Sequence, residues 1–168
     1  MNVDDDKHDL LFGVRRSVRY HNRRRQFFES FNTVVTALSL VFSSATVYGV
    51  LKEQELAMIA GSLVTILTAF NLVIGSAKKA SLHHDLSRRF LALEKKMLSQ
   101  PDIESMKLWI EERLDIEADE PPALRVLNSI CHNELARAMG YSKEYLTNIT
   151  WYQRIFSNFF DVREHAIS

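Results

Sequence analysis

Cysteine, proline and glycine are scarce in this chain, and charge is missing from two long stretches of it. The one cysteine, Cys131, excludes an internal disulfide. Its neighbours lack the spacing of zinc ligands, so we expect it to be a core residue. The chain has no glycine-rich phosphate loop, no nucleophile elbow and no His-Glu-x-x-His motif. We therefore expect no enzymatic activity, no cofactor and no metal site.

The two uncharged stretches are Ser30–Leu51 and Leu56–Ala77, which contain no Asp, Glu, Lys, Arg or His. Each is 22 residues long, and a helix of that length rises about 33 Å, close to the hydrocarbon thickness of a bilayer. Only the residues 52–55 separate them, so the pair predicts a transmembrane hairpin. Proton pumps, voltage sensors and ion-coupled transporters generally need ionisable residues within the membrane, so the sequence argues against these classes.

The charges that flank the two stretches predict the topology. Six arginines precede the first stretch, four basic residues follow the second, and the turn between them holds one lysine and two glutamates. Lys and Arg near the ends of spans stay on the cytoplasmic side. We therefore expect both termini in the cytoplasm, with the turn at 52–55 barely emerging on the other side of the membrane.

The fold class predicted is an all-α membrane protein with long helices that continue from the hairpin into a cytoplasmic helical region. We expect a basic amphipathic helix over 1–29, transmembrane helices over 30–51 and 56–77, an external turn over 52–55 and a cytoplasmic helical domain over 78–168. The second span should continue unbroken, because apolar residues keep helical spacing beyond it, at Leu82, Leu86, Phe90, Leu93 and Met97.

Further helices are expected in the last third of the chain. Ile103, Met106, Ile110 and Leu114 predict a short amphipathic helix that carries Trp109. A second helix should follow the Pro121-Pro122 pair and stop at Gly140, a C-terminal cap. His83 and His84 diverge on a helix and are expected on a solvated face.

Small or polar residues recur at helical spacing within both spans. One set comprises Asn32, Thr36, Ser39, Ser43 and Thr46, and the other comprises Gly61, Thr65, Thr68, Gly75 and Ser76. Small and hydroxyl residues often pack membrane helices together. The alternative is that one set lines a water-filled path in an oligomer, because two helices cannot enclose a pore. The candidate residues for either role are Thr36, Ser39, Ser43, Thr46, Thr65 and Thr68.

Two other groups are candidate contact surfaces. The arginines at Arg15, Arg16, Arg19, Arg23, Arg24 and Arg25 could set the topology and attract anionic lipids, or bind an anionic ligand such as a nucleotide. Nucleic-acid binding is not expected, because the chain as a whole is not basic. A C-terminal amphipathic helix should carry an interfacial anchor that either lies on the membrane or caps the cytoplasmic helices. Its residues are Trp151, Ile155, Phe156, Phe159 and Phe160.

The run Arg-Tyr-His-Asn-Arg-Arg-Arg-Gln-Phe-Phe at 19–28, the tight hairpin, and the closing Trp-Tyr-Gln-Arg at 151–154 and Asn-Phe-Phe at 158–160 resemble the SLATT family of bacterial two-transmembrane proteins. The resemblance implies a membrane effector of antiphage defence, which would breach the inner membrane. It also implies a nucleotide second messenger, or the synthase or sensor protein linked to it, as a partner.

The sequence is consistent with three functional hypotheses. The first is a non-enzymatic effector that oligomerises and permeabilises or depolarises the membrane in response to a cytosolic signal. The second is a membrane-anchored adaptor that docks a partner through its cytoplasmic region and forms no pore. The third is a holin-like lysis protein, against which the large cytoplasmic portion counts.

Overall fold

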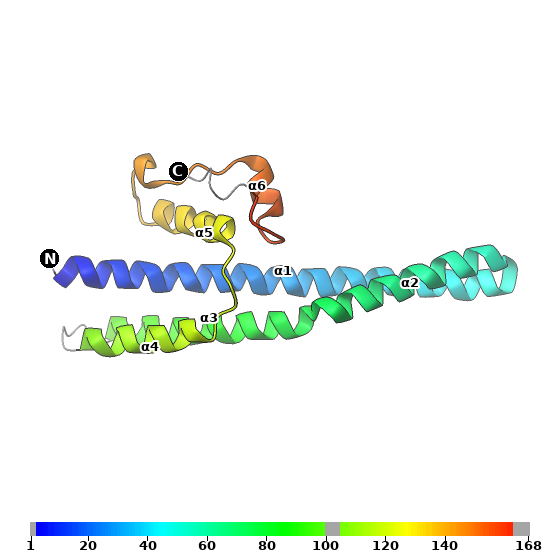
Figure 1. Ribbon diagram of the computed structural model, residues 1–168, viewed down its shortest axis with the longest axis horizontal. Coiled ribbons are helices and arrows are strands. Elements are labelled where there is room, and N and C mark those ends of the chain that lie inside the picture. Colours follow the sequence, from blue (N-terminus) through cyan, green and yellow to red (C-terminus); the bar gives the residue numbers. More distant parts are fainter. Residues whose placement is uncertain (1–2, 100–104, 163–168) are drawn as a thin grey trace. The chain divides into compact units, whose positions relative to one another are not determined.

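The computed structural model describes residues 3–99 and 105–162, and every regular element in them is a helix. The helices are α1 (Val3–Lys52), α2 (Gln54–Ile74), α3 (Ser76–Ser99), α4 (Met106–Ala118), α5 (Arg125–Ala138), the 3-10 helix η2 (Lys143–Tyr145) and α6 (Trp151–Phe156) (Figure 1). They form two compact units. We call Arg25–Leu82 the hairpin unit, and Met1–Arg24 with His83–Ser168 the helical unit.

The hairpin unit consists of two antiparallel helices joined by a single residue. Glu53 has extended backbone angles (φ −144°, ψ 108°) between α1 and α2, and its N–H donates to the carbonyl of Gly49 at 2.6 Å. At Gly49 a Cβ would lie 2.7 Å from the backbone nitrogen of Ala57. The absence of a side chain there therefore lets the two backbones meet directly below the turn.

A polar link joins the two helices at the opposite end of the hairpin. The Asn71 side chain donates to Oδ1 of Asn32 at 2.9 Å and accepts from the Ser76 hydroxyl at 2.8 Å. Ser76 is fully buried. Between this link and the turn, few side chains are buried, so the hairpin has almost no interior of its own.

The second span does not continue unbroken, contrary to the prediction. Gly75 adopts a left-handed conformation (φ 64°, ψ 42°) between α2 and α3, and its N–H donates to the carbonyl of Asn71 at 3.0 Å. Glycine adopts this conformation at little cost, and it is a common way to end a helix. By contrast, α1 is continuous over 50 residues, as predicted.

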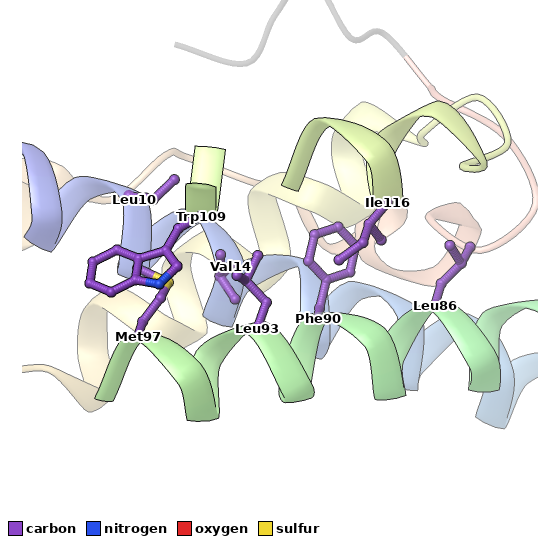
Figure 2. Packing of buried hydrophobic residues seen from close by; sticks show 8 residues of the cluster. All are labelled: Leu10, Val14, Leu86, Phe90, Leu93, Met97, Trp109 and Ile116. Atoms are coloured by element: carbon purple, nitrogen blue, oxygen red, sulfur yellow. The ribbon is translucent and has the colours of Figure 1, made fainter. Parts of the chain in front are cut away.

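The helical unit is held together by an apolar core between the N-terminal part of α1, α3 and α4 (Figure 2). Four of the five residues in the predicted stripe supply half of it, whereas Leu82 is exposed. The members of this core are Leu10, Val14, Leu86, Phe90, Leu93, Met97, Trp109 and Ile116. On α4 the predicted face is only partly correct. Trp109 is buried and Met106 packs against the core, whereas Ile110 and Leu114 are exposed and Ile116, which was not predicted, is buried instead. Ile103 lies outside the described residues.

Helix α5 packs on the other side of α1 within this unit (Figure 1). The phenol oxygen of Tyr20 accepts from the backbone N–H of Leu124 at 2.9 Å, just before α5 begins. Both carboxylate oxygens of Asp161 accept from the first N–H groups of α5, those of Arg125 and Val126, at 2.9 and 3.0 Å. A carboxylate there stabilises a helix N-terminus.

The end of α5 is as predicted. Gly140 is left-handed (φ 80°), its N–H donates to the carbonyl of Arg137, and that of Tyr141 donates to the carbonyl of Ala136. These two hydrogen bonds form a Schellman motif.

The close approach at Gly49 yields a matched pair of substitutions. We expect Gly49→Ala to lower the melting midpoint of the detergent-solubilised protein, because forcing a methyl group into tight packing costs about 1–3 kcal/mol. Gly61→Ala should change it little, because that Cβ would meet Thr46 Cγ2 at an ordinary 3.7 Å. Circular dichroism follows both, and equal midpoints for the two variants would contradict the close approach.

Candidate functional site

The outer surface of the hairpin unit is the first candidate site, because it is apolar and uncovered. The stretches Asp5–Val50 and Gln54–Ser99 each contain an 18-residue window apolar enough to cross a membrane, with mean hydropathy 1.6 and 2.1. Only 11% of each window is buried inside the structure. A core helix of a soluble protein would be mostly buried, so these helices match a membrane span better by composition and exposure.

Large side chains project from both hairpin helices. The most exposed are Val50, Leu72 and Val73, at 71%, 83% and 85%. Others with more than a third of their surface exposed are Val34, Leu38, Leu40, Val41, Val47, Leu56, Met58, Ile59, Leu63, Ile66 and Phe70. In water such a surface would drive aggregation, whereas hydrocarbon or a neighbouring copy would cover it favourably.

The polar stripe of the first span divides between two environments. Ser39 and Thr46 are half-buried, and Thr46 faces Gly61 of α2. Thr36 and Ser43 are exposed on the outside of the hairpin. The Thr36 and Thr46 hydroxyls each donate to the carbonyl four residues earlier, at 2.8 Å. One half of the stripe therefore belongs to helix packing, and the other half is available to a neighbour, to lipid or to water.

The second span presents its hydroxyls outward. Thr65 and Thr68 are exposed and line a shallow groove along α2 with Val64, Ala69 and Leu72. Their hydroxyls donate to the carbonyls of Gly61 and Val64. Because each donor is satisfied within its own helix, these threonines can lie in lipid or beside water at little cost.

The six arginines do not form one open cluster. Arg15 forms an ion pair with Glu94 of α3 at 2.7 Å, and Arg23 forms one with Glu134 of α5. Arg25 pairs with Glu29 in its own helix at 3.4 Å. Only Arg19 is exposed; the other five are half-buried. Much of this positive charge therefore joins α1 to its neighbours.

The two remaining arginines are perturbed by burial. Burial lowers the pKa of Arg16, and the nearby Arg113 guanidinium lowers it further. Burial also lowers the pKa of Arg24, which donates to the backbone carbonyl of Asn158 at 2.5 Å. The arginines thus remain candidates for lipid or anion contact mainly through Arg19.

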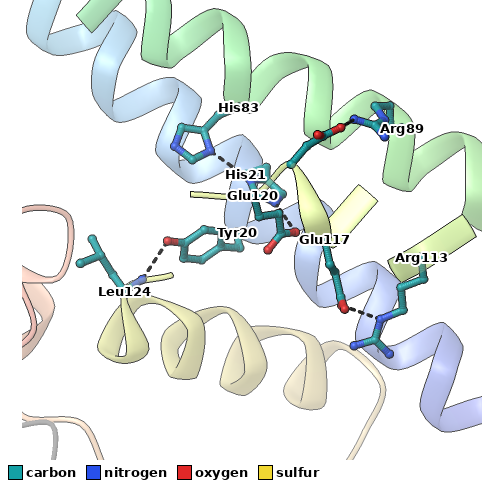
Figure 3. A network of polar contacts seen from close by, with 9 residues as sticks. Tyr20, His21, His83, Arg89, Arg113, Glu117, Glu120 and Leu124 are labelled. Carbon is teal, nitrogen blue, oxygen red and sulfur yellow. Dashed lines mark hydrogen bonds and ion pairs between the residues drawn. The ribbon is translucent and has the colours of Figure 1, made fainter. Parts of the chain in front are cut away.

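Sequence analysis missed a buried polar network centred on two histidines (Figure 3). His21 Nδ1 lies 2.9 Å from Nδ1 of His83, and its Nε2 lies 2.9 Å from Oε1 of Glu120. The prediction of a solvated His83 is wrong, because that side chain is 2% exposed. His83 precedes Leu86 by three residues and Phe90 by seven, and this position on the apolar stripe was the available signal.

The histidine pair is joined by a hydrogen bond. Of two Nδ1 atoms in contact, one donates and the other accepts. The His21 ring also stacks on Phe90, with centroids 5.6 Å apart. No group of three or more His, Cys, Asp or Glu side chains in the described ranges is arranged to hold a metal ion.

Cys131 is a core residue, as predicted. It is buried beside Tyr20 and Leu127, and burial raises its pKa to about 11. Its thiolate is therefore scarce at neutral pH, which makes it a poor nucleophile.

The aromatic segment differs from the expected long helix. Helix α6 spans six residues, Trp151–Phe156, and begins with a capping box formed by Thr150 and Gln153. Trp151 is 73% exposed, and Ile155, Phe156, Phe159 and Phe160 are exposed as well. This segment is the second candidate contact surface.

Comparisons with protein-family models, curated proteins and solved structures find no significant match. Membership of the SLATT family therefore stays a prediction from the sequence.

The histidine network makes a testable prediction with an adjacent control. His83→Ala should lower the free energy of unfolding by about 1–3 kcal/mol, because it leaves a cavity and an unpaired Nδ1 on His21. His84→Ala should change it by less than about 0.5 kcal/mol, because His84 is exposed. Denaturant titration in detergent measures both, and equal effects would mean that the pair is not formed.

Proposed function

We propose that this chain is a non-enzymatic effector of the bacterial inner membrane, whose hairpins assemble and permeabilise or depolarise the bilayer. The observation that carries the proposal is the hairpin unit itself. Its two helices each carry a long uncharged, apolar stretch and bury almost no interior between them, so the unit needs lipid or further copies to cover it. The antiphage setting and the nucleotide-linked signal are what the resemblance to SLATT proteins implies.

Assembly follows from the geometry of the hairpin. Two helices cannot surround a path, so permeation requires several copies side by side. The outward hydroxyls of Thr36 and Ser43 on α1, and of Thr65 and Thr68 on α2, are available where copies would meet. In an oligomer they would either hydrogen-bond between copies or line the path.

The helical unit would receive the cytosolic signal. It has its own apolar core and polar network, and it shares the helices α1 and α3 with the hairpin unit. A cytosolic partner or ligand that favours one packing of these helices over another would thereby bias the hairpin. Arg19 is the arginine best exposed for an anionic ligand.

A membrane-anchored adaptor is the second candidate. It is favoured by apolar side chains that the helical unit leaves exposed on α3 and α4, namely Leu91, Leu98, Leu108 and Leu114, at 54–63%. Such positions could dock a protein partner without any pore.

The topology follows from the charge asymmetry and can be tested by labelling. In a Cys131→Ser background, Gln54→Cys should react with an impermeant thiol reagent added outside, because the turn would emerge on the periplasmic side. Val3→Cys and Ser168→Cys should react only after the membrane is opened. Labelling of either terminus from outside would contradict this orientation.

Substitutions in the polar stripe of the first span test whether the protein forms a lined path, as an effector would, or none, as an adaptor would. We expect Thr36→Val/Ser43→Ala to abolish dye entry and depolarisation while cross-linked oligomers persist, because an apolar constriction dewets. The inner pair, Ser39→Ala/Thr46→Val, should instead leave dye entry intact and change the stability of the hairpin little, because the Thr46 hydroxyl donates within its own helix and the buried Ser39 hydroxyl has no hydrogen-bond partner among the described residues.

Leu67→Arg provides the control for insertion. It places a charge near the middle of the second span at a cost of about 2.5–3.5 kcal/mol, so the protein should be inert or absent from the membrane.

Unchanged permeation by the outer-pair variant, Thr36→Val/Ser43→Ala, would exclude a lined path. A wild-type protein that never conducts, even with its signalling partner, would favour the adaptor.

A further inference from the structure

We propose that the outward face of the aromatic segment binds the lipid headgroup–acyl interface of the membrane that the hairpin spans. This face, which we call the aromatic face, comprises Trp151, Ile155, Phe156, Phe159 and Phe160. The inference rests on the membrane insertion proposed above. It chooses between the two roles that the sequence left open for this segment, anchoring on the membrane and capping of the helices.

The segment is amphipathic, but its polar side chains face the protein and its apolar side chains face outward. Its polar side chains Gln153 and Ser157 are both 2% exposed, whereas the five members of the aromatic face are 42–73% exposed. Aromatic side chains contribute most to a core when they are buried, so a capping segment would turn them inward. Here they are turned away from the protein.

Hydrogen bonds hold the segment in this orientation. The Gln153 side chain accepts from the N–H of Thr150 at 2.9 Å and donates to the carbonyl of Val162 at 3.1 Å. The Ser157 hydroxyl donates to the carbonyl of Arg154 at 2.8 Å. These bonds lie within the segment, whereas the bonds of Asn158 to Arg24 and of Asp161 to the N–H groups of α5 join it to other helices. Turning the aromatic face inward would break the bonds to α1 and α5, so the outward orientation is built into the structure of this unit.

The segment is attached to α1 close in sequence to the first apolar stretch. The guanidinium of Arg24 donates to the carbonyl of Asn158 at 2.5 Å. Arg24 precedes Ser30, where the first apolar stretch begins, by six residues of one continuous helix. Tryptophan concentrates at the membrane–water interface in membrane proteins.

Charge favours lipid over a second copy as the occupant. Arg154 lies on the same short helix and is exposed. The acidic group within the described residues 151–162 is Asp161, whose carboxylate accepts from the N–H groups of α5. A basic side chain beside an aromatic surface complements an anionic leaflet, whereas it would repel its counterpart on another copy.

The chain provides its own reporters for a test. Its two tryptophans are Trp151, which is 73% exposed, and Trp109, which is 3% exposed in the core. The full-length protein would be reconstituted in phosphatidylethanolamine–phosphatidylglycerol vesicles that contain phosphatidylcholine brominated near the headgroup or near the chain end. The difference between wild type and Trp151→Phe isolates the emission of Trp151.

We expect loss of Trp151 emission with lipid brominated near the headgroup, a smaller loss with lipid brominated near the chain end, and protection from acrylamide. The remaining emission, from Trp109, should be unaffected. Ile155→Ser/Phe159→Ser should reduce the quenching of Trp151 while circular dichroism stays unchanged, because both side chains are exposed.

A third reporter separates this inference from its premise. Ile66→Trp, in the Trp151→Phe background, places a tryptophan at an outward position near the middle of the second span, and deep bromine atoms should quench it. If Ile66→Trp is quenched and Trp151 is not, the lipid contact is wrong although the hairpin is inserted. Acrylamide protection of Trp151 without bromine quenching would show a protein cover and also overturn it. If neither is quenched, membrane insertion fails and the inference fails with it.

Discussion

The continuity of α1 is the constraint on which the rest of the structure depends. Its 50 residues contain no proline, and its two glycines, Gly13 and Gly49, keep helical geometry. The same helix therefore supplies one member of the hairpin and one wall of the apolar core of the helical unit. A proline anywhere between these parts would remove a hydrogen bond and cost about 3 kcal/mol or more, and it would disconnect the two functions proposed for the molecule.

Periodicity and charge predicted the coarse structure well, because both reflect forces that act along the whole chain. The uncharged stretches became the hairpin helices, and the apolar stripe at Leu86, Phe90, Leu93 and Met97 became the core. Gly140 ends α5 as expected, because a left-handed glycine after an apolar run is a local signal. Gly75 carries the same signal, but the apolar pattern continues on both sides of it and conceals the break.

The features that sequence analysis missed depend on contacts between distant segments. His83 lies on the buried apolar stripe of α3, where His21 of another helix satisfies it by a hydrogen bond, and nothing in the sequence near either residue indicates that partner. The arginines look like one basic patch in the sequence, yet Glu94 and Glu134 come from far along the chain to neutralise two of them. The aromatic segment was expected to form a longer helix, whereas its helix spans only six residues, and the side chains of Gln153 and Ser157 lie inward and form hydrogen bonds within the segment.

The carboxylate of Asp161 joins the aromatic segment to the start of α5. It satisfies the first two N–H groups of α5, a helix that begins 36 residues earlier, at Arg125. Leu124, the residue before this helix, has no side-chain oxygen to take over that role. A truncation that removes Asp161 would therefore first destabilise the start of α5 at Arg125 and Val126, beside the packing of Tyr20. Its effect on the aromatic residues would be secondary. Asp161 is therefore a structural member of the helical unit, although it directly follows the exposed aromatic residues.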